Sequence, residues 1–156
     1  MPASAGVPTK IVVGTDGSET AARALERAVS LAAALGAELY IVSAFNDRAP
    51  AGVPAAGVSI DAGWVTAVKT AADKVVHEAE EQARSGGVKE VTAEALPGDP
   101  AEVLLQTTID RVADLLVVGS KGMQSTARFL LGPIANKVSR KVECDLLIVD
   151  TSAPTT

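Results

Sequence analysis

Short apolar runs alternate with longer amphipathic segments along this chain of 156 residues. The runs are nearly continuous and rich in Val, Ile and Leu, which is typical of strands buried on both faces of a parallel sheet. They predict five strands, over residues 10–15, 38–45, 88–96, 114–118 and 145–150. Apolar residues at helical spacing predict four helices between them, over residues 18–35, 64–83, 100–112 and 133–141.

Residues with capping side chains mark the ends of these helices. Ser18 and Asp99 suit the N-terminus of a helix, and Gly36 suits a C-terminus. The segment 46–61 is rich in Ala, Gly and Pro without periodicity, which predicts a mobile flap or a disordered excursion. At the start of the helix that follows, we expect Trp64 to anchor the core.

The regular alternation of strand and helix predicts the fold. It implies right-handed crossovers and a single doubly wound, five-stranded parallel sheet with helices on both faces, a Rossmann-like α/β domain. Ligands of such sheets bind beyond the carboxyl ends of the strands, where the winding reverses. If the first and fourth strands are neighbours at that reversal, Thr15 and Asp16 face Gly119 to Gly122 across one crevice.

Composition and charge narrow the possible classes of function. Hydrophobic residues make up 47% of the chain and aromatic residues 3%, so we expect a core of Ala, Val, Leu and Ile. A net charge of −5, with no dense basic stripe, argues against nucleic acid and anionic lipid as partners. The N-terminus has no apolar signal-like region and no run is long enough to span a membrane, so we expect a cytoplasmic protein.

Residues that usually carry catalysis or bind metals are scarce. Cys144 is the only cysteine and His77 the only histidine, which disfavours a disulfide, a Ser-His-Asp triad and a His/Cys metal site. We expect His77 to be solvated on a helix and Cys144 to be a small residue at the start of a strand. The chain also lacks the GxxxxGK motif of P-loop NTPases and the GxGxxG motif of dinucleotide-binding domains.

A glycine-rich segment follows the fourth predicted strand. Gly119, Gly122 and Gly132 lie between this buried strand and the next helix. Because glycine has no Cβ, a turn built on it can direct several N–H groups at an anion, and the helix adds the positive end of its dipole. The segment therefore predicts a phosphate-binding loop and a nucleotide site.

The spacing of these glycines resembles that of the universal stress protein family. The nucleotide-binding branch of that family carries GxxG, nine further residues, and then Gly followed by Ser or Thr. Here Gly119-Ser120-Lys121-Gly122 and Gly132 reproduce this spacing. Other similarities span nearly the whole chain, namely Thr-Asp-Gly-Ser at 15–18, Phe-Asn-Asp at 45–47 and Gly-Asp-Pro at 98–100.

The resemblance implies a fold and a set of binding residues. It implies an adenine nucleotide alpha hydrolase-like domain over residues 9–150, between flexible tails at 1–8 and 151–156. Asp16 matches an aspartate that holds the ribose or adenine end of the nucleotide, and Ala44 matches a position whose backbone reads adenine. The complete implied site consists of Thr15, Asp16, Gly17, Ala44, Gly119, Ser120, Gly122, Gly132, Pro133 and Ile134.

The resemblance also implies ligands and a role. ATP, with Mg²⁺ as a possible companion ion, is the usual ligand of the family, and some members bind cyclic AMP. The implied role is that of a sensor or regulator in the stress response, without a catalytic residue and at most with slow ATPase activity. The family further implies a homodimer joined through the last strand.

Pro133 departs from the family pattern, because it offers neither an N–H group nor a hydroxyl where the pattern has Ser or Thr. Hydrogen bonds to charged groups contribute ~1.5–3 kcal/mol, so one lost bond weakens triphosphate binding by roughly ten- to hundredfold. Lys121 or Arg128 could supply a compensating cation, although a solvated lysine is the commoner outcome beside a turn. The alternatives to ATP are therefore cyclic AMP or AMP, or a dimeric interaction module that binds no nucleotide.

Overall fold

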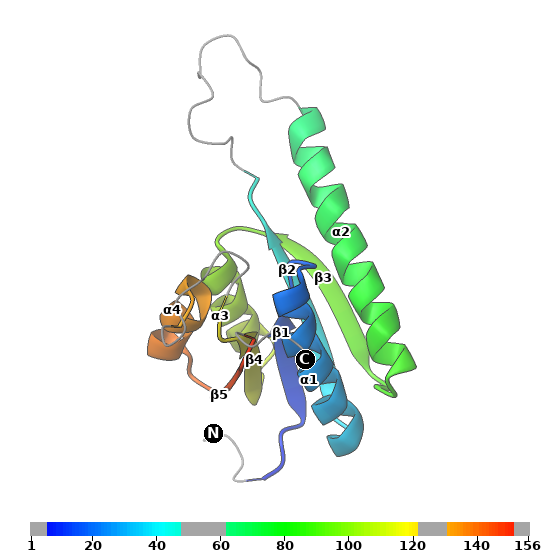
Figure 1. Ribbon diagram of the computed structural model, residues 1–156, viewed down its shortest axis with the longest axis vertical. Coiled ribbons are helices and arrows are strands. Elements are labelled where there is room, and N and C mark those ends of the chain that lie inside the picture. Colours follow the sequence, from blue (N-terminus) through cyan, green and yellow to red (C-terminus); the bar gives the residue numbers. More distant parts are fainter. Residues whose placement is uncertain (1–5, 48–61, 122–130, 152–156) are drawn as a thin grey trace.

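The five strands of the sheet are all parallel and lie in the order β3-β2-β1-β4-β5 (Figure 1). The computed structural model describes residues 6–47, 62–121 and 131–151. Its strands are β1 (Lys10–Gly14), β2 (Glu38–Phe45), β3 (Val91–Pro97), β4 (Leu115–Gly119) and β5 (Asp145–Val149). Its helices are α1 (Glu19–Leu35), α2 (Ala62–Ser85), α3 (Pro100–Asp110) and α4 (Pro133–Lys141).

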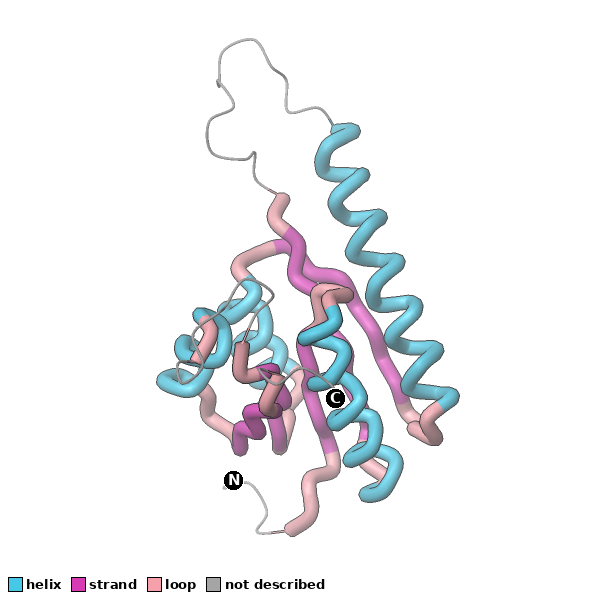
Figure 2. Tube along the Cα trace, viewed as in Figure 1, coloured by secondary structure: helices cyan, strands magenta, loops and turns pink. Residues whose placement is uncertain are grey.

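Helices cover both faces of the sheet, as the sequence predicts. On one face α1 and α2 bury their apolar residues against Ile11, Val13, Leu39 and Ile41. On the other face α3 and α4 contact the alternate strand residues, which include Val12 and Leu116. Because β1 and β4 pair directly, their carboxyl ends meet where the winding reverses, which confirms the predicted neighbourhood. The loops that leave these ends therefore lie along one edge of the sheet (Figure 2).

Several predicted boundaries and placements are wrong. The third strand begins at Val91 rather than at Val88, because the Val88 N–H donates to the Ala83 carbonyl oxygen (3.1 Å) and continues the turn after α2. Helix α3 ends at Asp110, and Val112 beyond it has a positive φ of 52° and is exposed. Trp64 does not anchor the core, since 40% of its surface is exposed.

Polar contacts tie the strands together near their amino ends. The Asp114 carboxylate accepts hydrogen bonds from the Thr9 hydroxyl (2.7 Å), the Thr9 N–H (2.8 Å) and the Lys10 N–H (2.9 Å). These bonds, the one from the Thr9 hydroxyl above all, lower the pKa of Asp114. This carboxylate thereby fixes the segment before β1 to the start of β4.

A second polar cluster lies between the sheet and the end of α3. The Tyr40 hydroxyl donates to the Glu94 carboxylate and accepts a hydrogen bond from the Arg111 guanidinium (2.7 Å). The guanidinium also stacks on the Tyr40 ring, 4.3 Å from its centroid. Burial, together with the bond to Glu94, raises the pKa of Tyr40 to about 12, so this residue is a neutral structural hydrogen-bond donor at physiological pH.

Candidate functional site

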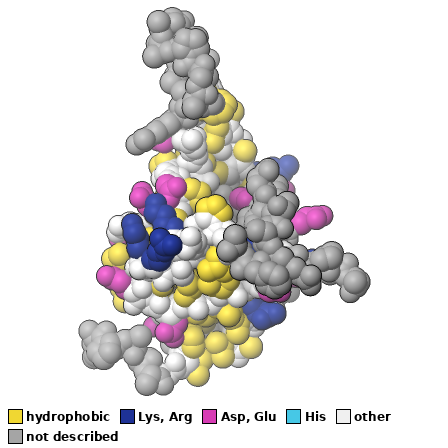
Figure 3. Space-filling view, turned by 60° about the vertical axis from the view of Figure 1, so that its left-hand side comes forward, with side chains coloured by type: hydrophobic (Ala, Val, Ile, Leu, Met, Phe, Trp, Pro, Cys, Tyr) yellow, Lys and Arg dark blue, Asp and Glu magenta, His cyan; other side chains and the backbone are white. Residues whose placement is uncertain are grey.

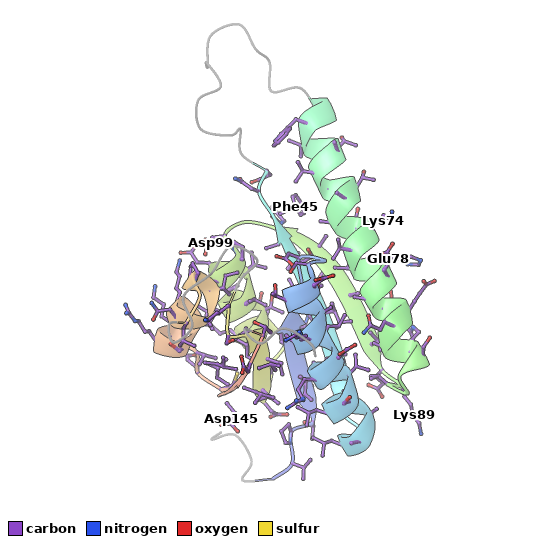
Figure 4. The ribbon with its side chains drawn as sticks, viewed as in Figure 1. Phe45, Lys74, Glu78, Lys89, Asp99 and Asp145 are labelled. Atoms are coloured by element: carbon purple, nitrogen blue, oxygen red, sulfur yellow. The ribbon has the colours of Figure 1, made fainter. Side chains whose placement is uncertain are left out.

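A cavity of about 610 Å³ lies at the carboxyl ends of β1, β2 and β4. Its walls come from the loop after β1, the starts of α1, α3 and α4, and the loop after β4. The size is that of a pocket for a small ligand, and the position is the one at which doubly wound sheets bind ligands. In Figure 4 the labelled Asp99 lies at the start of α3, next to α4, and marks this edge of the molecule.

Most residues of the predicted site line this cavity. They come from segments far apart in the sequence and comprise Thr15, Asp16, Ala44, Gly119, Gly132, Pro133 and Ile134. Gly17 and Ser120 belong to the same loops without lining the cavity, and Gly122 lies outside the described residues. Sequence reasoning did not assign Val42 and Leu104 to the site, because their apolar side chains carry only a core signal in the sequence.

The turn after β1 presents the Asp16 carboxylate to the cavity. The Thr15 N–H still continues the sheet by donating to the Val42 carbonyl oxygen (2.9 Å), and the chain then turns at Gly17. Gly17 has a φ of +82°, and a Cβ there would lie 3.1 Å from Val75, so a larger residue would be strained. The Asp16 side chain is exposed and accepts a hydrogen bond from the Ser18 N–H through Oδ1 (2.9 Å).

The loop after β4 uses its main-chain N–H groups within the protein. The Ser120 N–H donates to the Val149 carbonyl oxygen (2.7 Å), and the Gly132 N–H donates to the Ser120 carbonyl oxygen (2.7 Å). The Lys121 N–H donates to the Thr151 hydroxyl (3.2 Å), which in turn donates to the Lys121 carbonyl oxygen (3.1 Å). These three N–H groups therefore hold the loop in place and are not directed at a ligand.

Thr151 follows β5 and holds this loop, and the sequence did not single it out. It is buried, and a Cβ added to Gly119 would lie 3.0 Å from its methyl group. Gly119 is needed for this close approach of the end of β5 to the end of β4. No local sequence pattern reveals the contact between Thr151 and Lys121, because the two residues are 30 positions apart.

Three helices begin at the cavity, and α4 differs from the other two in how its N-terminus is capped. Ser18 caps α1 by accepting from the Ala21 N–H (3.2 Å), and Asp99 caps α3 by accepting from the Glu102 N–H (3.1 Å). The N-cap of α4 is Gly132, which makes no side-chain hydrogen bond.

The first turn of α4 can therefore donate to a ligand. Pro133 contributes no N–H, but the N–H groups of Ile134 and Ala135 belong to the turn that has no intrahelical acceptors. With the positive end of the helix dipole, they form the natural position for an anion in this cavity.

Charged side chains lie both beside the cavity, between α3 and α4, and in its wall. Lys137 of α4 pairs with Asp99 (3.3 Å) and Glu102 (3.1 Å) of α3, and Figure 3 shows basic and acidic side chains gathered on this face. The bond from the Glu102 N–H, helped by Lys137, lowers the pKa of Asp99. Lys121, for which the sequence left open a compensating cation or a solvated side chain, has 8% of its surface exposed and lines the cavity.

Other predicted placements agree with the structure. His77 is exposed on α2, 3.4 Å from Glu81, and Cys144 is partly buried just before β5. In the part of the chain that the structure describes, no group of three or more His, Cys, Asp and Glu side chains could hold a metal ion. None of the described helices is long and apolar enough to cross a membrane.

Comparison with known proteins places this chain in a family. The family model "Universal stress protein family" matches residues 8–150. The chain belongs to the universal stress protein family. Universal stress protein Rv1636 of Mycobacterium tuberculosis is 36% identical over 142 residues, which cover 91% of this chain and 96% of that protein.

Solved structures of universal stress proteins are similar over nearly the whole chain. A crystal structure of a universal stress protein in complex with cAMP is 31% identical, with a TM-score of 0.72, and the match covers 94% of this chain and 100% of that one. The universal stress protein UspA from Lactobacillus plantarum is 21% identical, with a TM-score of 0.78, over 90% of this chain and 97% of its own. These matches confirm the predicted five-stranded α/β fold.

Proposed function

We propose that this universal stress protein belongs to the nucleotide-binding branch of its family and binds an adenine nucleotide in the cavity of about 610 Å³. The observation that carries the proposal is the uncapped N-terminus of α4, which opens on this cavity, whose wall also includes Asp16. An anion-binding end and a hydrogen-bond-accepting end suit a phosphate joined to a nucleoside. By coupling its conformation to nucleotide level, the protein would act as a sensor or regulator in the stress response.

The proposed pose follows from the two ends of the cavity. The adenosine part lies against Thr15, Asp16 and Ala44, where Asp16 accepts hydrogen bonds from the ribose or the adenine. The phosphate part lies against the family loop and the start of α4, which contribute Gly119, Ser120, Gly122, Gly132, Pro133 and Ile134. A relative of 31% identity was solved in complex with cAMP, which supports an adenine nucleotide here.

ATP is the ligand that the resemblance to the family implies, and cyclic AMP and AMP are the alternatives. ATP would bring Mg²⁺, which commonly takes only one or two carboxylates besides phosphate oxygens and water. Among the described lining residues Asp16 is the carboxylate, and the pose gives it to the ribose or the adenine, so phosphate oxygens and water would hold the ion, which would supply charge neutralisation of the phosphates. The residues alone do not require the ion when the ligand has a single phosphate.

The test is the identity and affinity of the bound nucleotide. Mass spectrometry of heat-denatured purified protein should detect an adenine nucleotide, and calorimetric titration should rank ATP, AMP and cyclic AMP. The variant Ala44→Phe should weaken all three by roughly ten- to hundredfold, because overpacking costs ~1–3 kcal/mol. The matched control Ala34→Phe, at an exposed position of α1, should bind as the original protein does. If the original protein binds none of the three at millimolar concentration, the proposal is wrong.

A homodimer joined through β5 is the second part of the proposal. Among the described strands β5 pairs only with β4, and its Leu146, Leu147 and Ile148 are half-buried. An apolar edge strand of this kind invites pairing with a second copy. The same observation supports the alternative role as an interaction module, which would dimerise without binding nucleotide. Light scattering at micromolar concentration should give the mass of a dimer.

A further inference from the structure

Lys121 lines the cavity without a partner for its charge among the residues that the structure describes. Only 8% of the residue is exposed, and it lines the cavity at the carboxyl end of β4. Its two hydrogen bonds to Thr151 are made by its main-chain N–H and carbonyl oxygen, so they do not involve the ammonium group. Ion pairs between described residues use other basic side chains, namely Lys69, Lys74, His77, Arg84, Arg111 and Lys137.

The Lys121 ammonium keeps contact with solvent, because no buried side-chain nitrogen or oxygen of the described residues lacks a hydrogen-bond partner. A ligand that fills the cavity displaces this water, and the ammonium then needs an opposite charge, because desolvation of an unpaired charge costs several kcal/mol. Lys137, the basic residue of α4 closest in sequence to the cavity wall, is held by Asp99 and Glu102 outside the cavity. Lys121 is therefore the basic side chain that an anion entering the cavity would meet, as far as the described residues go.

The main-chain donors for that anion are few. The N–H groups of Ser120 and Lys121 are bound within the protein, and Pro133 has none. The first turn of α4 offers the N–H groups of Ile134 and Ala135. One lysine and one helix N-terminus balance a single phosphate group, whereas the chain of phosphates in ATP carries several further charges into a protein of net charge −5.

We propose that Lys121 is the counterion of the bound phosphate and makes the site selective for adenine nucleotides with one phosphate group. This inference rests on the proposed function, because it requires an adenine nucleotide in the cavity. It gives Lys121 a defined role, and it reverses the preference for ATP that the family resemblance implies. Cyclic AMP and AMP share the required chemistry, and titration with each distinguishes the cyclic from the open phosphate.

The experiment compares three variants of the full chain by calorimetric titration with adenosine, AMP, cyclic AMP and ATP. Lys121→Met removes the charge and keeps the apolar stem, Lys121→Arg keeps the charge, and Lys74→Met is the matched control on the exposed face of α2. We expect Lys121→Met to lower the affinity for its preferred single-phosphate nucleotide by about ten- to hundredfold, the effect of a hydrogen bond to a charged group. The affinity of Lys121→Met for adenosine should equal that of the original protein. Lys121→Arg should keep the nucleotide affinity of the original protein.

Thermal unfolding of the ligand-free variants separates this role from a structural one. Because the ammonium has no counterion among the described residues, Lys121→Met should unfold at the same or a higher temperature than the original protein, whereas a lysine needed for folding would give a lower temperature. The inference is overturned if the original protein binds ATP more tightly than both AMP and cyclic AMP. It is also overturned if Lys121→Met lowers the affinities for adenosine and for the nucleotides equally, or if it lowers none of these affinities. Failure of the original protein to bind any adenine nucleotide would instead refute the proposed function itself.

Discussion

Replacement of Gly132 by Asp would put a negative charge at the position proposed for the phosphate. Gly132 is the N-cap of α4, with φ −63° and ψ 167°, and these angles are ordinary for any residue. An Asp side chain there can accept a hydrogen bond from the first turn of the helix, as Asp99 does for α3. The substitution should therefore stabilise the empty protein while it blocks the anion site.

Both effects can be estimated. An Asp in place of Gly at an N-cap gains a few tenths of a kcal/mol from the hydrogen bond and ~0.3–1 kcal/mol from the helix dipole. For a chain of this length, the sum raises the melting temperature by about 1–4 °C. Two unit charges 4 Å apart near a protein surface repel by about 4 kcal/mol, so even a partly screened carboxylate should weaken AMP binding by at least about a hundredfold.

The matched control is Gly132→Asn, which caps the helix without a charge. Melting curves of the empty proteins and calorimetric titration with AMP and adenosine measure both effects. We expect both variants to melt at or above the temperature of the original protein, and only Gly132→Asp to lose AMP while it keeps adenosine. Equal AMP affinity in the two variants would refute the assignment of the phosphate to α4.

Three further predictions concern other parts of the molecule. Pro133→Ser restores an N–H and a hydroxyl at the start of α4, and should raise ATP affinity by roughly ten- to hundredfold in calorimetry; an unchanged affinity would show that these donors do not reach the phosphates. Asp114→Asn should lower the melting temperature at neutral pH. Because the pKa of Asp114 is lowered on folding, its contribution is complete above about pH 4 and is lost in more acidic solution, so the difference from the original protein should close there; a constant difference from pH 7 to 3 would contradict this. Ile148→Lys should convert the proposed dimer to a monomer in light scattering, and an intact dimer would place the interface elsewhere.

The sequence predicted the framework well because its strongest signals are local. Apolar runs bounded by Ser18, Gly36 and Asp99 located the elements to within a few residues, and the capping bonds of these residues are present in the structure. Val88 was misplaced because a buried apolar residue in a turn has the same pattern as one in a strand. Trp64 was misplaced because helical spacing does not reveal that α2 begins beyond the end of the sheet, as Figure 1 shows.

The site was predictable only where glycine spacing or a turn marked it. Asp16 and Gly119 follow directly from strand ends, and the doubly wound topology brings them to one cavity. The position of Lys121 was not predictable, since its main-chain N–H and carbonyl oxygen are bound by Thr151, which lies 30 residues later, beyond β5. The sequence Gly132-Pro133 already shows that α4 has no capping side chain. That this leaves α4 as the helix open to a ligand is apparent only from the structure, in which the side chains of Ser18 and Asp99 cap α1 and α3.

The polar contacts of Asp114 and of Tyr40 with Arg111 have a consequence for how such a protein can diverge. They fasten strands and helix to one another far from the cavity, whereas the cavity walls are loops and helix starts. Substitutions in those walls can change which ligand is recognised without removing the contacts that stabilise the fold. Evolution, or a protein engineer, can therefore retune recognition at one edge of the sheet while the other edge keeps the domain folded.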